Sequence, residues 1–133
     1  MASIFTKIIQ GDIPAHKVAE NTDYLAFLDI NPLVMGHVLV IPKKEVDYIF
    51  DLDDETYLGL HAFAKEVAIG LKKAVPCVRI GTAVVGLEVP HVHIHLVPMN
   101  TMDDLNFSRP KLHPGTQELE KTAELIRNSL LER

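Results

Sequence analysis

The sequence predicts an α+β fold: an antiparallel sheet of about five strands with one long helix and a C-terminal helix. Apolar residues recur at helical spacing in two segments, residues 53–75 and 117–131. Short runs rich in β-branched residues lie mostly before and after the first segment and do not alternate with helices. This order favours an antiparallel sheet with helices on one side over a parallel, doubly wound sheet.

Strands are expected at residues 24–30, 37–43, 77–85 and 91–98, with a weaker one at 17–23. The stretches "NPLVMG" and "GLEVP" contain the glycine, proline and asparagine that are typical of turns, and they separate these runs.

The long helix is expected to begin after Asp53, whose carboxylate suits an N-cap. The acidic run "DLDDE" is explained by this cap and by the positive end of the helix dipole, so it indicates no metal site. The second helix follows "PG" and is expected to be capped by Thr116. Its expected inner face consists of Leu119, Thr122, Ala123, Ile126 and Leu130.

Composition limits the class of protein. A chain of 133 residues, 47% of them hydrophobic, suits one domain (residues 1–133) with a core that needs no disulfide. The net charge of -5 argues against nucleic-acid polymers and membranes as partners, but not against small phosphate-bearing ligands. Cys77, the single cysteine, lies among apolar residues and is expected to be a buried small hydrophobe. The sequence shows no apolar segment typical of a membrane span or a signal peptide, so a cytoplasmic protein is expected.

Three histidines stand at alternate positions in "PHVHIHLVP": His91, His93 and His95. On an extended strand they share one face, while Val92 and Ile94 point to the other. One explanation is chance use of histidine on a solvated face, and a second is zinc. A single ion does not easily take all three, because the outer two lie roughly 13 Å apart on a strand. The third explanation is catalysis, since histidine serves as nucleophile and proton donor near neutral pH.

These residues carry a family resemblance. The segment His-Val-His-Ile-His-Leu-Val at 91–97 resembles the signature of the histidine triad (HIT) nucleotide-binding family. "IFTKIIQGDIPAHKVAEN", "AFLDINP" and "GHVLVIPKK" are similar in order and spacing to its Hint-like branch, so the resemblance covers residues 4–98. It implies a single domain of HIT-like fold with a C-terminal extension, residues 99–133, that contains the last helix.

The resemblance also implies roles for individual residues. His93 corresponds to a nucleophile that attacks the α-phosphorus of a nucleotide, and His95 to a residue at the phosphate, where its protonated form would stabilise negative charge. His91 corresponds to the residue that orients the nucleophile, and His37 to a fourth histidine beside the group. Asp29 corresponds to the carboxylate that holds the ribose hydroxyls. The implied slot for the purine base consists of Phe5, Ile8, Ile13, Phe27 and Ile30, and the implied phosphate loop contains Gly86, Glu88 and Val89. Without the resemblance, the apolar residues of this slot would be assigned to the core.

The chain also departs from the family pattern. Glu88 stands where Hint proteins usually have Ser or Thr, and a carboxylate repels a phosphate unless it turns outward. Ser3 and Thr6 stand where many bacterial relatives have zinc-binding cysteines, and Glu45 replaces a histidine ligand. We therefore expect no structural zinc and no required cofactor.

The implied activity is cleavage of a purine nucleoside monophosphate from a leaving group joined through its phosphate, as in a phosphoramidate. A diadenosine polyphosphate hydrolase and a nucleotide-binding regulatory module with little turnover are the alternatives. The resemblance also implies a homodimer, formed where the long helix from Asp53 and the strand near Cys77 meet their copies.

Overall fold

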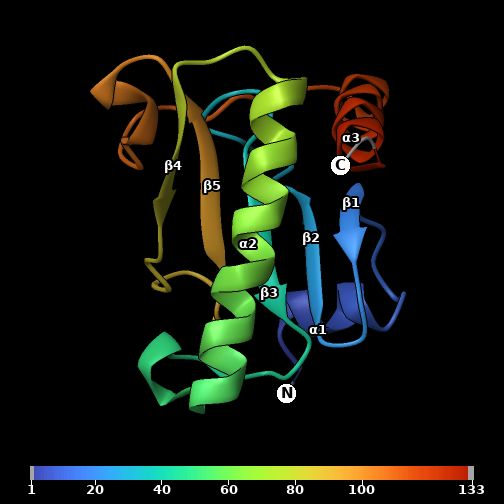
Figure 1. Cartoon of the computed structure of the whole chain (residues 1–133), viewed down its shortest axis with the longest axis vertical. Helices are drawn as coiled ribbons and strands as arrows, with labels where there is room; N and C mark the ends of the chain where they lie inside the picture. Colours follow the sequence, from blue (N-terminus) through green and yellow to red (C-terminus); the bar gives the residue numbers. More distant parts are fainter. Residues whose placement is uncertain (1, 132–133) are drawn as a thin grey trace.

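The computed structural model describes residues 2–131, so the ends of the expected domain (1–133) and of the extension (99–133) lie outside the described residues. Five antiparallel strands form one sheet in the order β1-β2-β3-β5-β4 (Figure 1). Their bounds are Lys17–Glu20 (β1), Tyr24–Leu28 (β2), Val38–Pro42 (β3), Arg79–Ala83 (β4) and Ile94–Met99 (β5). The predicted α+β class is confirmed.

The long helix α2 (Asp54–Ala74) lies across one face of the sheet (Figure 1). Asp53 is its N-cap, as predicted, because its side chain accepts a hydrogen bond from the Thr56 amide. The core beneath α2 contains every second residue of β2, such as Ala26 and Leu28, together with Leu60 and Leu71 of the helix. Burial of this apolar face provides most of the stability of such a layer.

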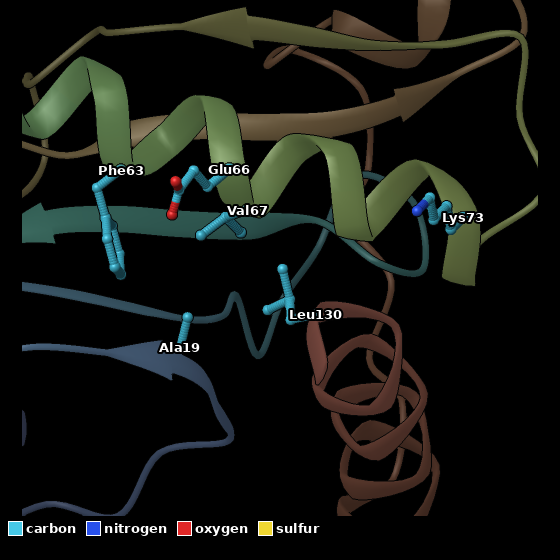
Figure 2. Close-up of a pocket in the computed structure, with 6 residues that line it drawn as sticks. All are labelled: Ala19, Phe63, Glu66, Val67, Lys73 and Leu130. Carbon is cyan, nitrogen blue, oxygen red and sulfur yellow. The ribbon is translucent and has the colours of Figure 1, made fainter. Parts of the chain in front are cut away.

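The C-terminal helix α3 spans Thr116–Leu131, so Thr116 is its first residue and not its cap. It packs against α2 and the edge strand β1. Figure 2 shows a hollow between these elements, with Phe63 and Glu66 from α2, Ala19 from β1 and Leu130 from α3 among its labelled residues. None of the residues that line this hollow is a histidine. It is therefore separate from the site described below.

The expectation of helices on only one side of the sheet is wrong. A short helix, α1 (Ile4–Ile9), packs its buried Phe5 and Ile8 against Leu25 and Phe27, which point away from α2. The Ser3 side chain caps α1 by accepting a hydrogen bond from the Thr6 amide. Two single turns of 3-10 helix, Ile49–Asp51 and Met102–Leu105, complete the secondary structure of the described residues.

The strands are shorter than predicted, and this matters for the site. The segment 91–93 precedes β5, and Asp29 and Ile30 follow β2. Cys77 is partly exposed and not buried as expected, because it lies in the connection between α2 and β4, next to an exposed Val78.

Candidate functional site

A cavity of about 490 Å³ lies where α1, the ends of β2, β3 and β5, and the connection after β4 meet. It is lined by Ile4, Phe5, Asp29, Ile30, Asn31, His37, Leu39, Val85, Gly86, Leu87, Glu88, Val89, His93, His95, Phe107 and Lys111. All four predicted histidines are buried, which excludes the solvated-face explanation. Three of them line the cavity, and His91 lies behind it with no exposed surface.

His93 is held in one tautomer by the main chain. Its Nδ1–H donates to the carbonyl oxygen of His91 at 2.8 Å, so Nε2 carries the free lone pair. The ring lies edge-on to Phe5, with centroids 5.0 Å apart, and 4.9 Å from the His95 ring. In the unprotonated ring, this arrangement leaves Nε2 as a nitrogen nucleophile in a cavity whose wall is apolar on one side.

His95 is held in the opposite tautomer through His37. The Leu33 amide donates to His37 Nδ1 at 3.1 Å, so the proton of the neutral His37 ring lies on Nε2. That Nε2–H donates to His95 Nδ1 at 2.9 Å, which leaves the His95 proton on Nε2. One histidine of the pair therefore offers a lone pair and the other offers an N–H.

The expected protonated form of His95 is wrong for the free protein. Burial and the neighbouring His93 lower the pKa of His95 to about 4. Burial, with the adjacent His95, lowers the pKa of His37 to about 3. Both rings are neutral at neutral pH, so His95 acts as a hydrogen-bond donor and carries no positive charge.

His91 is fixed by a polar cluster that joins α1 to the loop after β3. Its Nε2–H donates to the Pro42 carbonyl at 2.8 Å, and its Nδ1 accepts from the Ser3 hydroxyl at 2.8 Å. Glu45 accepts from the Ser3 amide at 2.7 Å and from the Thr6 hydroxyl at 2.5 Å. These hydrogen bonds lower the pKa of Glu45 to about 2. The cluster holds the His91 backbone, and that backbone in turn orients His93.

Asp29 lies at the edge of the cavity, where Oδ1 accepts from the Asn31 amide at 2.9 Å and Oδ2 lies 3.9 Å from His37 Nε2. Burial raises the pKa of this carboxyl. Glu88 is exposed at the cavity wall, and its negative charge also acts to raise the pKa of Asp29. Gly86 has a φ of 74°, and no atom lies within 4 Å of where its Cβ would be, so the turn itself requires glycine here.

The five residues of the predicted base slot lie in three places. Phe5 and Ile30 line the cavity, whereas Ile8 and Phe27 lie in the apolar cluster around Phe5. Ile13 lines a second hollow of about 490 Å³, which shares Ile30 and Asn31 with the first. The two hollows therefore adjoin at Ile30 and Asn31.

Seven cavity residues were not predicted as site residues from the sequence: Ile4, Asn31, Leu39, Val85, Leu87, Phe107 and Lys111. Of these, Phe107 and Lys111 lie outside the segments that carry the family resemblance. Both come from the C-terminal extension, and the Phe107 ring lies edge-on to His95 at a centroid distance of 4.7 Å. The only sequence signal was an aromatic and a basic residue in a stretch without periodicity, which is too weak to indicate a site.

A group of possible metal ligands lies in the cavity, formed by Asp29, His37 and His95. Two of its ligand atoms are joined by the hydrogen bond between the two rings. At the cysteine positions of the zinc-binding relatives, Ser3 and Thr6 offer hydroxyls, which are not the thiolate or imidazole ligands that structural zinc takes. The polar cluster that contains Ser3 and Thr6 therefore does not offer a ligand set that fits a four-coordinate zinc ion.

Residues 10–102 match the sequence profile of the HIT domain. The chain belongs to the HIT family. It is 37% identical over 113 residues to an uncharacterized HIT-like protein of Borreliella burgdorferi, covering 80% of this chain and 81% of that protein. It is 35% identical over 133 residues to the adenosine 5′-monophosphoramidase of Schizosaccharomyces pombe, covering 98% and 99%.

Solved structures support the HIT assignment. The crystal structure of a zinc-bound histidine triad family protein from Mycobacterium smegmatis matches with a TM-score of 0.85 at 30% identity, covering 99% of this chain and 95% of that one. Within residues 2–131, no helix of this HIT protein combines the length and apolarity that crossing a bilayer requires.

Proposed function

We propose that this HIT protein is a nucleotide hydrolase that releases a purine nucleoside monophosphate from a leaving group joined through its phosphate. The observation that carries the proposal is the pair of opposite tautomers: an unprotonated His93 Nε2 beside a His95 Nε2–H in one cavity. The related phosphoramidase of Schizosaccharomyces pombe supports a phosphoramidate as the substrate class.

The proposed chemistry has two steps. The lone pair of His93 Nε2 attacks the α-phosphorus, and the bond from phosphorus to the leaving group breaks. The leaving group departs with the electrons of that bond and takes a proton from water. The His95 Nε2–H donates a hydrogen bond to a phosphoryl oxygen as negative charge develops there. Water then attacks phosphorus and releases a proton, which neutralises the hydroxide left by the first step; the P–N bond breaks, and its electron pair returns to His93 as the lone pair.

The remaining residues bind the nucleoside in this proposal. Asp29 accepts hydrogen bonds from the ribose hydroxyls, since its Oδ2 lies 3.9 Å from His37 Nε2, which is beyond hydrogen-bond distance. The base lies over Phe5 and Ile30. It extends past Ile30, which lines both hollows, toward Ile13. The protein needs no zinc and no cofactor for this chemistry.

We further propose that the protein is a homodimer. β4 is an edge strand, and between it and α2 lies a hollow of about 560 Å³. Its lining consists of the apolar residues Ala68, Ile69 and Ile80 and of Lys65, Lys72 and Lys73. An unpaired edge next to an apolar surface suits pairing with a second copy.

The enzyme and the binding module are separated by one experiment. The protein is mixed with an adenosine phosphoramidate, quenched within milliseconds and analysed by intact-protein mass spectrometry. We expect an adduct of one AMP on His93, stable to base and broken by acid, that is absent from His93→Ala. His61→Ala, which changes an exposed histidine of α2 that lines neither this cavity nor the adjoining hollow, is the matched control. If the wild type turns over no substrate and forms no adduct while it still binds AMP, the protein is a binding module.

A further inference from the structure

A segment beyond the matched HIT domain reaches the histidines. The domain profile ends at residue 102, yet Lys111 lines the cavity together with His37, His93 and His95. Lys111 is partly buried, and Phe107 of the same segment packs edge-on against His95. The segment is therefore part of the site wall.

The main chain on both sides of Lys111 is anchored to the loop between β2 and β3. The Arg109 guanidinium donates to the Leu33 carbonyl at 2.7 Å, and it also pairs with Asp103 and Asp104. After Lys111, the Leu112 amide donates to the Pro32 carbonyl at 2.9 Å. Lys111 thus lies between two fixed points, which restricts where its ammonium group can reach.

The charges of the cavity explain what this ammonium group can do. The described lining contains two carboxylates, Asp29 and Glu88, and its histidines at 37 and 95 are neutral at neutral pH. Lys111 is the only lysine or arginine among these lining residues. Its positive charge opposes the burial that raises the pKa of Asp29, and it adds to the burial that lowers the pKa of His37 and of His95. A phosphate that enters this cavity meets two negative side chains and one positive one.

We propose that Lys111 is a phosphate-binding residue of this site, with its ammonium group paired to a non-bridging oxygen of the nucleotide phosphate. The identification of the ligand as a nucleotide rests on the proposed function. Lys111 keeps all its protons and forms no covalent bond. Its role is to offset the repulsion from Asp29 and Glu88 and to stabilise the charge that develops as His93 attacks.

The test compares AMP with adenosine, which lacks the phosphate. By calorimetry, Lys111→Gln should weaken AMP binding by roughly 10- to 100-fold and leave adenosine binding unchanged, because a charge-assisted hydrogen bond is lost. Lys111→Arg should restore most of the AMP affinity. Lys121→Gln, which removes the same charge from an exposed position on α3, should change neither affinity. A ratio of AMP to adenosine affinity that is equal in Lys111→Gln and the wild type would overturn the proposal.

A kinetic measurement keeps the two proposals separate. If the wild type forms the His93 adduct and Lys111→Gln forms it as fast, the role of Lys111 is wrong while the proposed function stands. If the wild type forms no adduct but the AMP-to-adenosine ratio still falls in Lys111→Gln, the hydrolase is wrong and the phosphate contact stands. Should Lys111→Gln unfold, Lys111→Met is measured in the same way, and an unchanged ratio there overturns the proposal equally.

Discussion

Mild acid should destabilise this protein before its carboxylates are protonated, because His37 and His95 are buried as neutral rings. Burial lowers the pKa of His37 to about 3 and that of His95 to about 4. In the unfolded chain both take up a proton as the pH falls through about 6.5, whereas the folded protein takes up neither until the pH approaches 4. The stability from both groups is therefore complete above pH 6.5 and is lost as the pH falls toward those values.

The size of the effect follows from proton linkage. A histidine that stays neutral in the folded state costs about 2 kcal/mol of unfolding free energy between pH 7 and pH 5, so the pair costs about 4 kcal/mol. A loss of this size is a large part of the ~5–15 kcal/mol that holds a typical domain folded. The value of about 4 kcal/mol requires only that the His37 and His95 rings are both neutral at pH 5. The titratable groups around them are Asp29, His93 and Lys111.

Urea unfolding at pH 7 and at pH 5, at one protein concentration, measures this loss. His37→Gln removes one titrating group, and its amide oxygen can accept the hydrogen bond from the Leu33 amide that His37 Nδ1 accepts now. The variant should lose about 2 kcal/mol less than the wild type between the two pH values. His61→Gln, a change at an exposed histidine of α2, should behave like the wild type. Equal losses in His37→Gln and the wild type would refute the reasoning.

Four further outcomes are expected. Asp29→Asn should weaken AMP binding by roughly 1.5 to 3 kcal/mol in calorimetry, and an unchanged affinity would remove Asp29 from the ribose site. Leu60→Ala should lower the free energy of unfolding by about 2–5 kcal/mol, because Leu60 is fully buried, whereas Leu125→Ala, at an exposed position, should cost under about 0.5 kcal/mol. Dialysis against EDTA should leave the melting temperature and activity unchanged, and a drop in either would point to a bound metal. Light scattering at micromolar concentration should return a dimer, and a monomer would contradict the proposed assembly.

The sequence predicted those features that depend on local patterns. The apolar spacing of α2 and the cap at Asp53 are set within a few residues, and both agree with the structure. Helix α1 has 6 residues, which is too short for a helical period to emerge, although Ser3 three positions before Thr6 is a capping signal. Its packing on the sheet depends on contacts with distant strands, which no local pattern encodes.

Prediction of the site failed where distant segments meet. The alternation of His91, His93 and His95 indicated catalysis, but it does not show which carbonyl or amide each ring contacts. The tautomer of His95 also depends on His37, which lies far away in the sequence. The neutral state of His95 depends on its burial, and the sequence reasoning assumed a protonated ring. Lys111 reaches the cavity because Arg109 and the amide of residue 112 are anchored to the β2–β3 loop, which precedes them by more than seventy residues.

The groups that set the proton positions of the triad are largely main-chain atoms: the carbonyls of His91 and Pro42 and the amide of Leu33. Substitution of a side chain cannot delete a carbonyl, and only proline deletes an amide hydrogen. Substitutions around the site therefore leave the tautomers of the histidines unchanged as long as the backbone conformation is preserved. Substitutions at Leu33 and Pro42 that preserve this conformation should keep the tautomers, but both side chains are buried, so such substitutions should lower the free energy of unfolding. A deep mutational scan that measures activity and stability separately should find that substitutions at Leu33 and Pro42 act mainly on stability, whereas substitutions at the histidines act on activity.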